Sequence, residues 1–399
     1  MKPLRDKFLS MLGLRASWGI VGKAPDADYL FYSTYNTSSG RYGKGNSLLT
    51  VATIDGLKLD DLRWEKTTSW DLGFDFSVFS HRLTGSFDVY HKKSSDVLAQ
   101  IDLDPTTGWS SLYTNNAQTL NKGMELQLSA EILKARTRSQ VGVSMDFTLA
   151  YNKNKILKLY HEPTSGWSAL GSYHEGDPIN SLYSFAFDHV ETDEDGYQQL
   201  YWRAADGSTY CNDLYTTTFK VEDVKFSGSL DPKWSGSIMP VITWQGFSLG
   251  ASFVWYAGHY FRADAQRWDT DISLSYEASV PRSYLDYWRK PESERSGVLG
   301  NGYMMYYMNV SIYDLKYCDQ NVDHADYMKL RNIVLGYSFS RDICNKSGIN
   351  QLRLRFQMNN VATWTRNKFD IDPEANNPVT GIEQNKTPRS YTMSLFVNF

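Results

Sequence analysis

The chain has 399 residues, with 41 basic and 45 acidic side chains and a formal net charge of −4. This balance gives no electrostatic basis for binding nucleic acid, and the apolar content of 41% is too high for a disordered protein. Mean hydropathy is −0.47. No stretch approaches the roughly 20 apolar residues of a membrane-spanning helix, which excludes helical membrane proteins. Membrane β-barrels remain, because their alternating strands average out as polar.

Strict alternation of apolar and polar residues is the clearest pattern in the chain. It is uninterrupted in residues 69–78, 123–132 and 140–149, and residues 391–399 repeat it at the end. Chance would produce a ten-residue alternation less than about once at this composition. A period of two indicates a strand with one apolar and one polar face. The pattern predicts about twelve strands, in chain order 12–21, 66–79, 82–98, 120–132, 139–152, 179–190, 196–204, 233–244, 247–257, 326–339, 350–361 and 389–399.

The lengths of these strands and of their connections favour a membrane barrel. Many strands have ten residues or more, which is the length that a tilted strand needs to cross hydrocarbon. Short turns alternate with long segments, as in outer-membrane barrels. A soluble β-sandwich is the alternative, but the inward positions hold Asp, Glu, Arg and Gln instead of a second apolar layer. We therefore predict an all-β fold, a transmembrane antiparallel β-barrel, with interfacial aromatic girdles that include Trp18, Trp64, Trp70, Trp244, Trp255 and Tyr256.

The ends of the chain and its cysteines bear on the cellular compartment. No apolar signal segment follows Met1, so either the chain is cytoplasmic or its export signal lies elsewhere. Cys211, Cys318 and Cys344 form no CxxC or zinc pattern. Free thiols are expected, with a Cys211–Cys318 bridge as the alternative.

Five motifs, in the same order as in the family, resemble SusC/RagA-type TonB-dependent outer-membrane transporters. They are residues 14–19 (LRASWG), 62–73 (LRWEKTTSWDLG), 121–126 (NKGMEL), 327–337 (YMKLRNIVLGY), and 359–365 (NNVATWT) followed by 372–374 (DPE). Val361 stands where the family's asparagine–leucine pair has its second member, a mild departure. The resemblance runs from residue 12 to residue 399.

The resemblance implies that residues 1–399 are the C-terminal portion of a barrel of about 22 strands, without signal peptide, TonB box or plug. Strands 12–21 and 389–399 would then be edges that pair with an N-terminal half carrying the plug. That half is either a separate chain or part of one longer protein. The implied partners are this N-terminal half, a SusD-like surface lipoprotein as a lid, TonB acting through the plug, and the lipid bilayer of the bacterial outer membrane.

The implied function is nutrient import of a glycan or a peptide. A passive porin of twelve strands and a structural half-barrel in a larger assembly are the alternatives. An enzyme is not expected, because no set of acid, base and nucleophile is present. The seven histidines lack metal-ligand spacing, so neither a metal nor a cofactor is predicted. A loop calcium on Asp269, Asp271, Asp323 or Asp326 is the alternative, whereas residues 193–196 (DEDG) predict a tight turn.

Two sets of residues are candidate functional sites. Aromatic rings in long loops present flat apolar faces to sugars, which makes candidate ligand contacts of Trp109, Tyr113, Trp167, Tyr173, Trp268 and Tyr287. Packing of loop against loop, or against a partner, is the competing interpretation. The last strand ends on an aromatic residue and resembles the signal read by the outer-membrane assembly machinery, with Tyr391, Met393, Leu395, Val397 and Phe399 on one face. A merely lipid-facing strand is the simpler interpretation.

Overall fold

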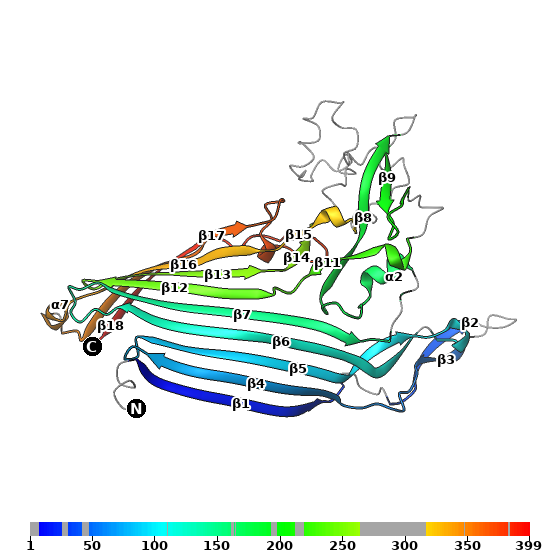
Figure 1. Ribbon diagram of the computed structural model, residues 1–399, viewed down its shortest axis with the longest axis horizontal. Helices are drawn as coiled ribbons and strands as arrows, with labels where there is room; N and C mark the ends of the chain where they lie inside the picture. Colours follow the sequence, from blue (N-terminus) through cyan, green and yellow to red (C-terminus); the bar gives the residue numbers. More distant parts are fainter. Residues whose placement is uncertain are drawn as a thin grey trace.

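Ten strands form one continuous antiparallel sheet, which we call the wall (Figure 1). The computed structural model describes residues 8–25, 31–41, 48–109, 111–160, 163, 165–192, 198–211, 219–263, 317–346, 348–381 and 384–399. The wall strands, in spatial order, are β1 (Leu9–Lys23), β4 (Glu65–Val78), β5 (Leu83–Asp102), β6 (Ser111–Leu133), β7 (Gly142–Lys158), β12 (Trp234–Trp244), β13 (Phe247–Ala257), β16 (Tyr327–Ser338), β17 (Gln351–Thr365) and β18 (Ser390–Asn398).

The connections of the wall segregate by length. The turns at 79–82, 134–141, 245–246 and 339–350 join neighbouring strands, and they gather at one end of the sheet together with the short helix α7 (Arg341–Lys346) (Figure 1). The long segments leave from the opposite end. We call these the short-turn end and the long-loop end. The alternation of short and long connections predicted from the sequence is therefore confirmed.

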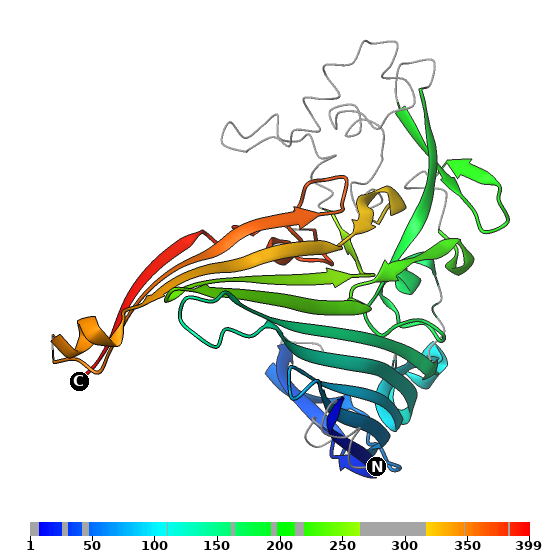
Figure 2. The ribbon, with the colours of Figure 1, turned by 60° about the vertical axis from the view of Figure 1, so that its left-hand side comes forward.

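The two faces of the wall differ sharply in chemistry. One face carries apolar side chains that stand in the open: Leu14, Trp18 and Met393 are 81%, 72% and 73% exposed. The register places Leu14 opposite Phe74 and Trp18 opposite Trp70, so apolar residues of adjacent strands share this face. Such a surface costs free energy in water and suits hydrocarbon. The opposite face is polar, with Ser17 opposite Asp71, and the sheet as a whole is curved (Figure 2).

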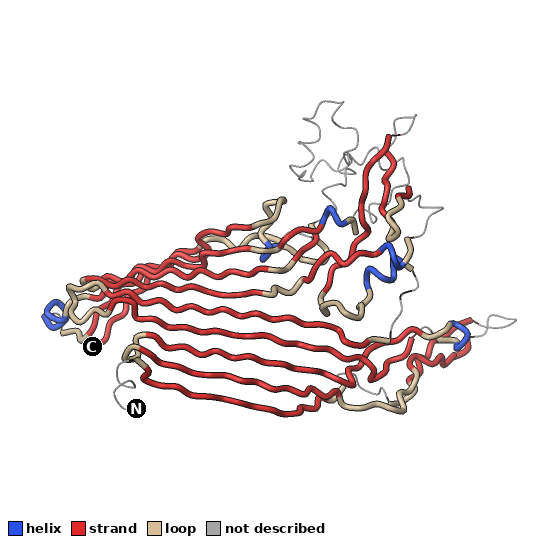
Figure 3. Tube along the Cα trace, in the orientation of Figure 1, coloured by secondary structure: helices blue, strands red, loops and turns tan. Residues whose placement is uncertain are grey.

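Two predicted wall strands lie elsewhere, so the prediction of twelve wall strands is wrong for the described residues. Segments 179–190 and 196–204 become β8 (Ser181–Thr192) and β9 (Gln198–Arg203), which belong to a separate four-stranded sheet ordered β10-β9-β8-β11. β10 is Thr209–Cys211 and β11 is Val224–Ser229. This loop sheet stands beyond the long-loop end (Figures 1 and 3). Its strand β8 buries Leu182, Tyr183 and Phe185 against protein and not against lipid.

Smaller elements complete the long-loop end. A hairpin joins β2 (Thr34–Arg41) to β3 (Leu48–Gly56), and β14 (Tyr260–Arg262) pairs with β15 (Val322–His324). The helix α2 (Gly166–Gly171) and four 3-10 turns, η1 (Pro105–Thr107), η2 (Val221–Asp223), η5 (Asp319–Asn321) and η6 (Pro373–Ala375), lie in the long connections. Among the described residues, no helix is long and apolar enough to span a membrane.

The wall is an open sheet. β1 pairs only with β4, and β18 only with β17, within the described part of the chain. The prediction that residues 12–21 and 389–399 are the two edges is therefore confirmed. An edge strand in hydrocarbon would leave backbone N–H and C=O groups unpaired, which a membrane does not tolerate. In hydrocarbon, each edge would therefore need a neighbouring strand.

Candidate functional site: the mouth pocket and the polar wall

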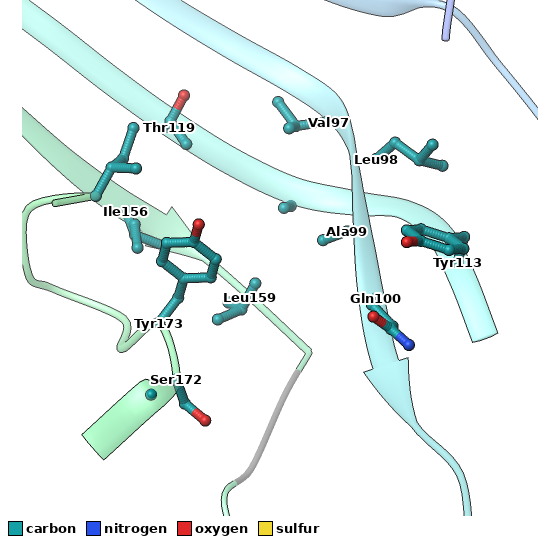
Figure 4. Close-up of a pocket in the computed structure, with 13 residues that line it drawn as sticks. Val97, Leu98, Ala99, Gln100, Tyr113, Thr119, Ile156, Leu159, Ser172 and Tyr173 are labelled. Atoms are coloured by element: carbon teal, nitrogen blue, oxygen red, sulfur yellow. The ribbon is translucent and has the colours of Figure 1, made fainter. Parts of the chain in front are cut away.

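A cavity of about 690 Å³ lies at the long-loop end of the wall (Figure 4). We call it the mouth pocket. β5, β6 and β7 supply one side, and the segment 171–179 closes the other. Thr119 and Ile156 pair across β6 and β7 on the polar face, so the pocket opens on that face. Its lining is mostly apolar: Val97, Leu98, Ala99, Tyr113, Ala117, Ile156, Leu159, Tyr173 and Ile179, with Gln100, Thr119, Gly171 and Ser172.

Hydrogen bonds fold segment 171–179 back over the end of β7. Ser165 and Ser168 form a capping box that starts α2. After the helix, Gly176 N–H donates to the carbonyl of Ile156, and Ile156 N–H donates to the carbonyl of Asp177, each at 2.9 Å. The Asn154 side chain accepts from Ile179 N–H at 2.9 Å. These bonds hold Tyr173 beside Leu159 in the pocket (Figure 4).

The structure brings together two of the six predicted ligand aromatics. Tyr113, on β6, lies beside Gln100, and Tyr173 lies on the facing segment (Figure 4). Their side chains are accessible, at 45% and 56% exposure. A cavity walled by apolar groups, with a few polar ones, is the usual form of a small-molecule site.

Two other predicted aromatics, Trp167 and Trp109, are among the described residues and do not line this pocket. Trp167 lies on α2 and packs edge to face against Phe185 and Phe219, with centroids 5.3 and 5.7 Å apart. It therefore covers the aromatic core of the loop sheet. Trp109 follows η1 and is hydrogen-bonded locally to Thr107. Trp268 and Tyr287 lie outside the described residues. Ligand contact by any of the six stays a prediction.

The polar face below the pocket is a network of charged and hydroxyl groups. Arg15 on β1 contacts Asp75 on β4 at 2.9 Å and Asp88 on β5 at 2.8 Å. Gly73 lies between Arg15 and Asp88 in the register, and a Cβ there would come within 2.1 Å of Asp88. The glycine therefore lets the guanidinium reach across a strand.

Further along this face, hydroxyl and amide groups link strand to strand. The Tyr90 hydroxyl donates to Asn152 at 3.0 Å, and the Thr148 and Ser237 hydroxyls are 2.8 Å apart.

A second cavity of about 380 Å³, the wall pocket, lies between β5 and β13 and includes Asp88, Glu125 and Tyr256. Tyr256 is therefore on the polar face, and its prediction as an interfacial girdle residue is wrong.

A carboxylate pinned by three donors anchors the loop after β17, and we call it the loop anchor. Glu374, on η6, accepts from the Tyr327 hydroxyl at 2.7 Å, from Lys329 Nζ at 2.6 Å and from Arg331 Nη1 at 2.9 Å. Burial alone would raise the pKa of Glu374, but these hydrogen bonds outweigh it and lower the pKa below its ordinary 4.5. The loop is thereby fixed to β16.

Sequence reasoning did not assign the loop anchor. Both of its parts were visible as motifs, YMKLRNIVLGY and DPE, but their contact was not. Asp372 of the second motif also approaches Lys329 Nζ, at 3.5 Å.

A second junction ties the roots of the long loops together at Asp326. This carboxylate accepts from Gly258 N–H at 2.7 Å and from Arg366 Nη1 at 3.2 Å. His259 Nδ1 and His324 Nδ1 lie 3.8 and 3.9 Å from it. Burial lowers the pKa of His259, although Asp326 and Asp231 oppose this shift.

Arg262 joins the loop sheet to these roots. It is 2% exposed and donates to the Tyr183 carbonyl at 2.6 Å and to the Ser184 hydroxyl at 3.2 Å. Its own N–H donates to the carbonyl of Pro378 at 2.9 Å. Burial lowers the pKa of Arg262 to about 10. One side chain thus connects β8, β14 and the loop after β17.

Potential metal ligands and cysteines can be located among the described residues. No group of three His, Cys, Asp or Glu side chains among them could hold a metal ion. Two of the four calcium candidates are described: Asp323 accepts hydrogen bonds from the His324 and Lys368 N–H groups, and Asp326 holds the loop roots. The other two, Asp269 and Asp271, lie outside the described residues. So does the predicted turn at 193–196. Cys318 and Cys344 are free thiols, as expected.

The last strand presents its apolar side chains outward at an open edge. Tyr391, Met393, Leu395, Val397 and Phe399 are 63%, 73%, 62%, 38% and 84% exposed. In the register Met393 lies opposite Phe356 and Leu395 opposite Leu354, on the apolar face. This placement agrees with a lipid-facing strand. Its use as an assembly signal stays a prediction.

An apolar outer face, a polar inner face and segregated loops are the features of the wall of an outer-membrane β-barrel. The family model "TonB dependent receptor-like, beta-barrel" matches residues 7–361, and the chain therefore belongs to this family. The predicted fold class, outer-membrane location and non-enzymatic class are confirmed, and so is the resemblance to SusC/RagA-type transporters.

Individual relatives agree in fold and extent. A TonB-dependent receptor of Formosa agariphila is 25% identical and covers 94% of this chain. TonB-dependent receptor SusC of Bacteroides thetaiotaomicron is 24% identical and covers 98%. Among solved structures, the RagAB peptide transporter aligns over 100% of this chain with a TM-score of 0.76 at 20% identity. The chain spans 38% of each of these two curated relatives and 42% of the aligned RagAB chain.

Proposed function

We propose that this chain forms the C-terminal part of the barrel wall, with its extracellular loops, of an energised importer of oligomeric nutrients, either glycans or peptides. The observation that carries the proposal is the mouth pocket, an accessible cavity with two tyrosine rings that opens on the polar face of the wall. An aromatic face suits the C–H face of a sugar or an apolar peptide side chain. The polar groups beyond it suit a hydrated substrate in transit.

The two open edges support a partner that completes the barrel. β1 and β18 each need a neighbouring strand in the membrane. We propose an N-terminal half that supplies these strands and a plug, either in another chain or in one longer protein. TonB would act through that plug. A SusD-like surface lipoprotein would cover the long-loop end as a lid, where the four-stranded loop sheet stands.

The open sheet gives no support to a self-contained porin. Such a porin requires pairing between its first and last strands, and β1 and β18 do not pair in the described chain. A purely structural half-barrel also leaves the mouth pocket without a role.

Co-purification and uptake test the proposal together. The chain, tagged in its native cells, is purified in detergent, and the co-purifying chains are identified by mass spectrometry. We expect strands completing the barrel, a plug and a surface lipoprotein. Uptake of fluorescent maltohexaose and of a fluorescent hexapeptide is then followed with and without a protonophore. Recovery of the chain alone, or uptake that ignores the protonophore, contradicts the proposal.

Substitution in the mouth pocket tests the site itself. Y113A/Y173A removes both rings and should lower uptake of the transported probe about tenfold, since each aromatic contact is worth about 0.5–1.5 kcal/mol. Tyr160→Ala is the matched control, because Tyr160 is also exposed, at 50%, and does not line the pocket. Equal loss in the control would show that the effect is not specific to the mouth pocket.

A further inference from the structure

A third cavity, separate from the mouth pocket, lies beside the loop anchor on the polar face. It has a volume of about 260 Å³ and is bounded by β17, by Lys329 of β16 and by the loop after β17. We call it the anchor pocket. Lys329 lies opposite Val254 in the register, and Val254 lines the wall pocket. The two cavities therefore open on the same face of the sheet.

The floor of the anchor pocket is built from buried charges that neutralise one another. Lys329 and Asp372 are 4% and 7% exposed. Lys329 Nζ lies 2.6 Å from Glu374 and 3.5 Å from Asp372, and Arg331 also binds Glu374. Two cations thus face two carboxylates. This cluster contributes shape and rigidity to the pocket, with no net charge.

The remaining charges of the lining are not balanced. Lys386 and Arg389 lie on the segment that leads into β18, and both line the pocket. Neither forms an ion pair with a described residue. Asp370 is the one other charged residue of the lining. The accessible part of the pocket therefore carries two positive charges and one negative charge.

The neutral lining is rich in hydrogen-bonding groups. Thr363, Thr365, Thr387 and Asn360 supply hydroxyl and amide groups, and Val361 and Ala362 are the only apolar residues of the lining. No aromatic ring and no deep apolar recess is present that would take a peptide side chain. A volume of about 260 Å³ accommodates one sugar ring.

We propose that the anchor pocket binds one carboxylate-bearing sugar unit of an oligosaccharide during passage. The carboxylate would lie between Lys386 and Arg389, because two cationic donors form the strongest hydrogen bonds to an anionic oxygen. The hydroxyls of the ring would bond the threonines and Asp370. This inference rests on the proposed transport function and names a substrate class for it, acidic oligosaccharides.

Binding by the purified assembly tests the proposal. Isothermal titration at low salt compares trigalacturonate, its fully methyl-esterified neutral form, and triglutamate. K386Q/R389Q removes both rim cations. K134Q/R136Q makes the same change of charge in the short turn at 134–141, which does not line the pocket. Heat-modifiability on gels verifies that both variants are folded.

We expect trigalacturonate to bind about tenfold more tightly than its methyl ester, K386Q/R389Q to abolish this preference, and K134Q/R136Q to keep it. Equal binding of acid and ester, a preference that survives K386Q/R389Q, or no binding of any probe overturns the proposal. Tighter, cation-dependent binding of triglutamate overturns the saccharide assignment. If the assembly takes up neutral maltohexaose in a protonophore-sensitive way, the proposed transport function stands whatever the binding result. If it takes up none of the probes, the transport function is contradicted independently of the binding result.

Discussion

Glu374 is the residue on which the position of the loop after β17 depends. Its carboxylate gathers Tyr327, Lys329 and Arg331, and Lys329 is almost fully buried. Removing the charge leaves a buried ammonium with only the more distant Asp372. We expect Glu374→Gln to weaken local stability of the loop by about 2 kcal/mol. Hydrogen exchange of residues 366–381 measures this change.

Glu222→Gln is the matched control for the loop anchor, since Glu222 is an exposed carboxylate in η2. It should leave exchange of residues 366–381 unchanged. Exchange that does not quicken in the Glu374 variant would show that the backbone bonds of this loop suffice to hold it.

His259 makes the loop roots sensitive to acid. Its folded pKa lies below the ordinary 6.5 because it is buried, so the unfolded chain takes up this proton first as pH falls. The free energy of unfolding of the loop roots is therefore unaffected by this proton above pH 6.5. It decreases as the pH falls from 6.5 towards the lower folded pKa of His259. We expect the opening free energy of residues 258–263 and 322–326, measured by hydrogen exchange and corrected for the intrinsic exchange rate at each pH, to fall from pH 7.5 to pH 5. His259→Asn should flatten this dependence, and an unchanged slope would assign it to other groups.

At the scale of elements, the β12–β13 hairpin depends on a single glycine. Gly246 has φ +91°, and a Cβ there would come within 2.2 Å of Arg138 Nη2 and 2.6 Å of the Ser338 carbonyl. Gly246→Ala therefore combines backbone strain with a clash, and we expect a loss of about 2 kcal/mol. Gly250→Ala on the same hairpin meets only ordinary contacts at 3.5 Å. Urea unfolding should distinguish the two, and equal midpoints would contradict the clash.

Periodicity predicted the ten wall strands but misplaced β8 and β9. Alternation shows that one face of a strand is apolar, and it cannot show whether that face meets lipid or protein. On β8 four successive residues, Leu182 to Phe185, are buried, whereas wall strands expose one face. Local sequence patterns also could not predict the contacts of the loop anchor, because Arg331 and Glu374 are 43 residues apart. Tyr113 and Tyr173 were chosen as loop aromatics, and their shared cavity depends on folded segments that no spacing reveals.

The loop sheet should unfold without the wall. Its core is Phe185, Trp202, Phe219 and Cys318, each 1% exposed. We expect Trp202→Ala to cost about 3–5 kcal/mol, which frees the loop sheet for proteolysis and leaves heat-modifiability of the barrel intact. Trp167→Ala, at the surface of the same core and 38% exposed, should cost less. A barrel that loses heat-modifiability together with the loop sheet would show that they fold as one unit.

At the scale of the whole molecule, the fold is defined by a wall with one face for lipid and one for water. Leu126 and Gln127 are adjacent on β6 and point to opposite faces. Leu126 lies opposite Phe87 and Leu149, and Gln127 opposite Ser86 and Thr148. An arginine on the lipid face near the midplane costs about 2–4 kcal/mol, and one on the luminal face is solvated. Leu126→Arg should therefore lower the urea midpoint of the assembled barrel in liposomes, while Gln127→Arg, at the same depth, should leave it nearly unchanged. A larger loss in Gln127→Arg would reverse the assignment of the faces, and with it the location of the mouth and anchor pockets on the path of the substrate.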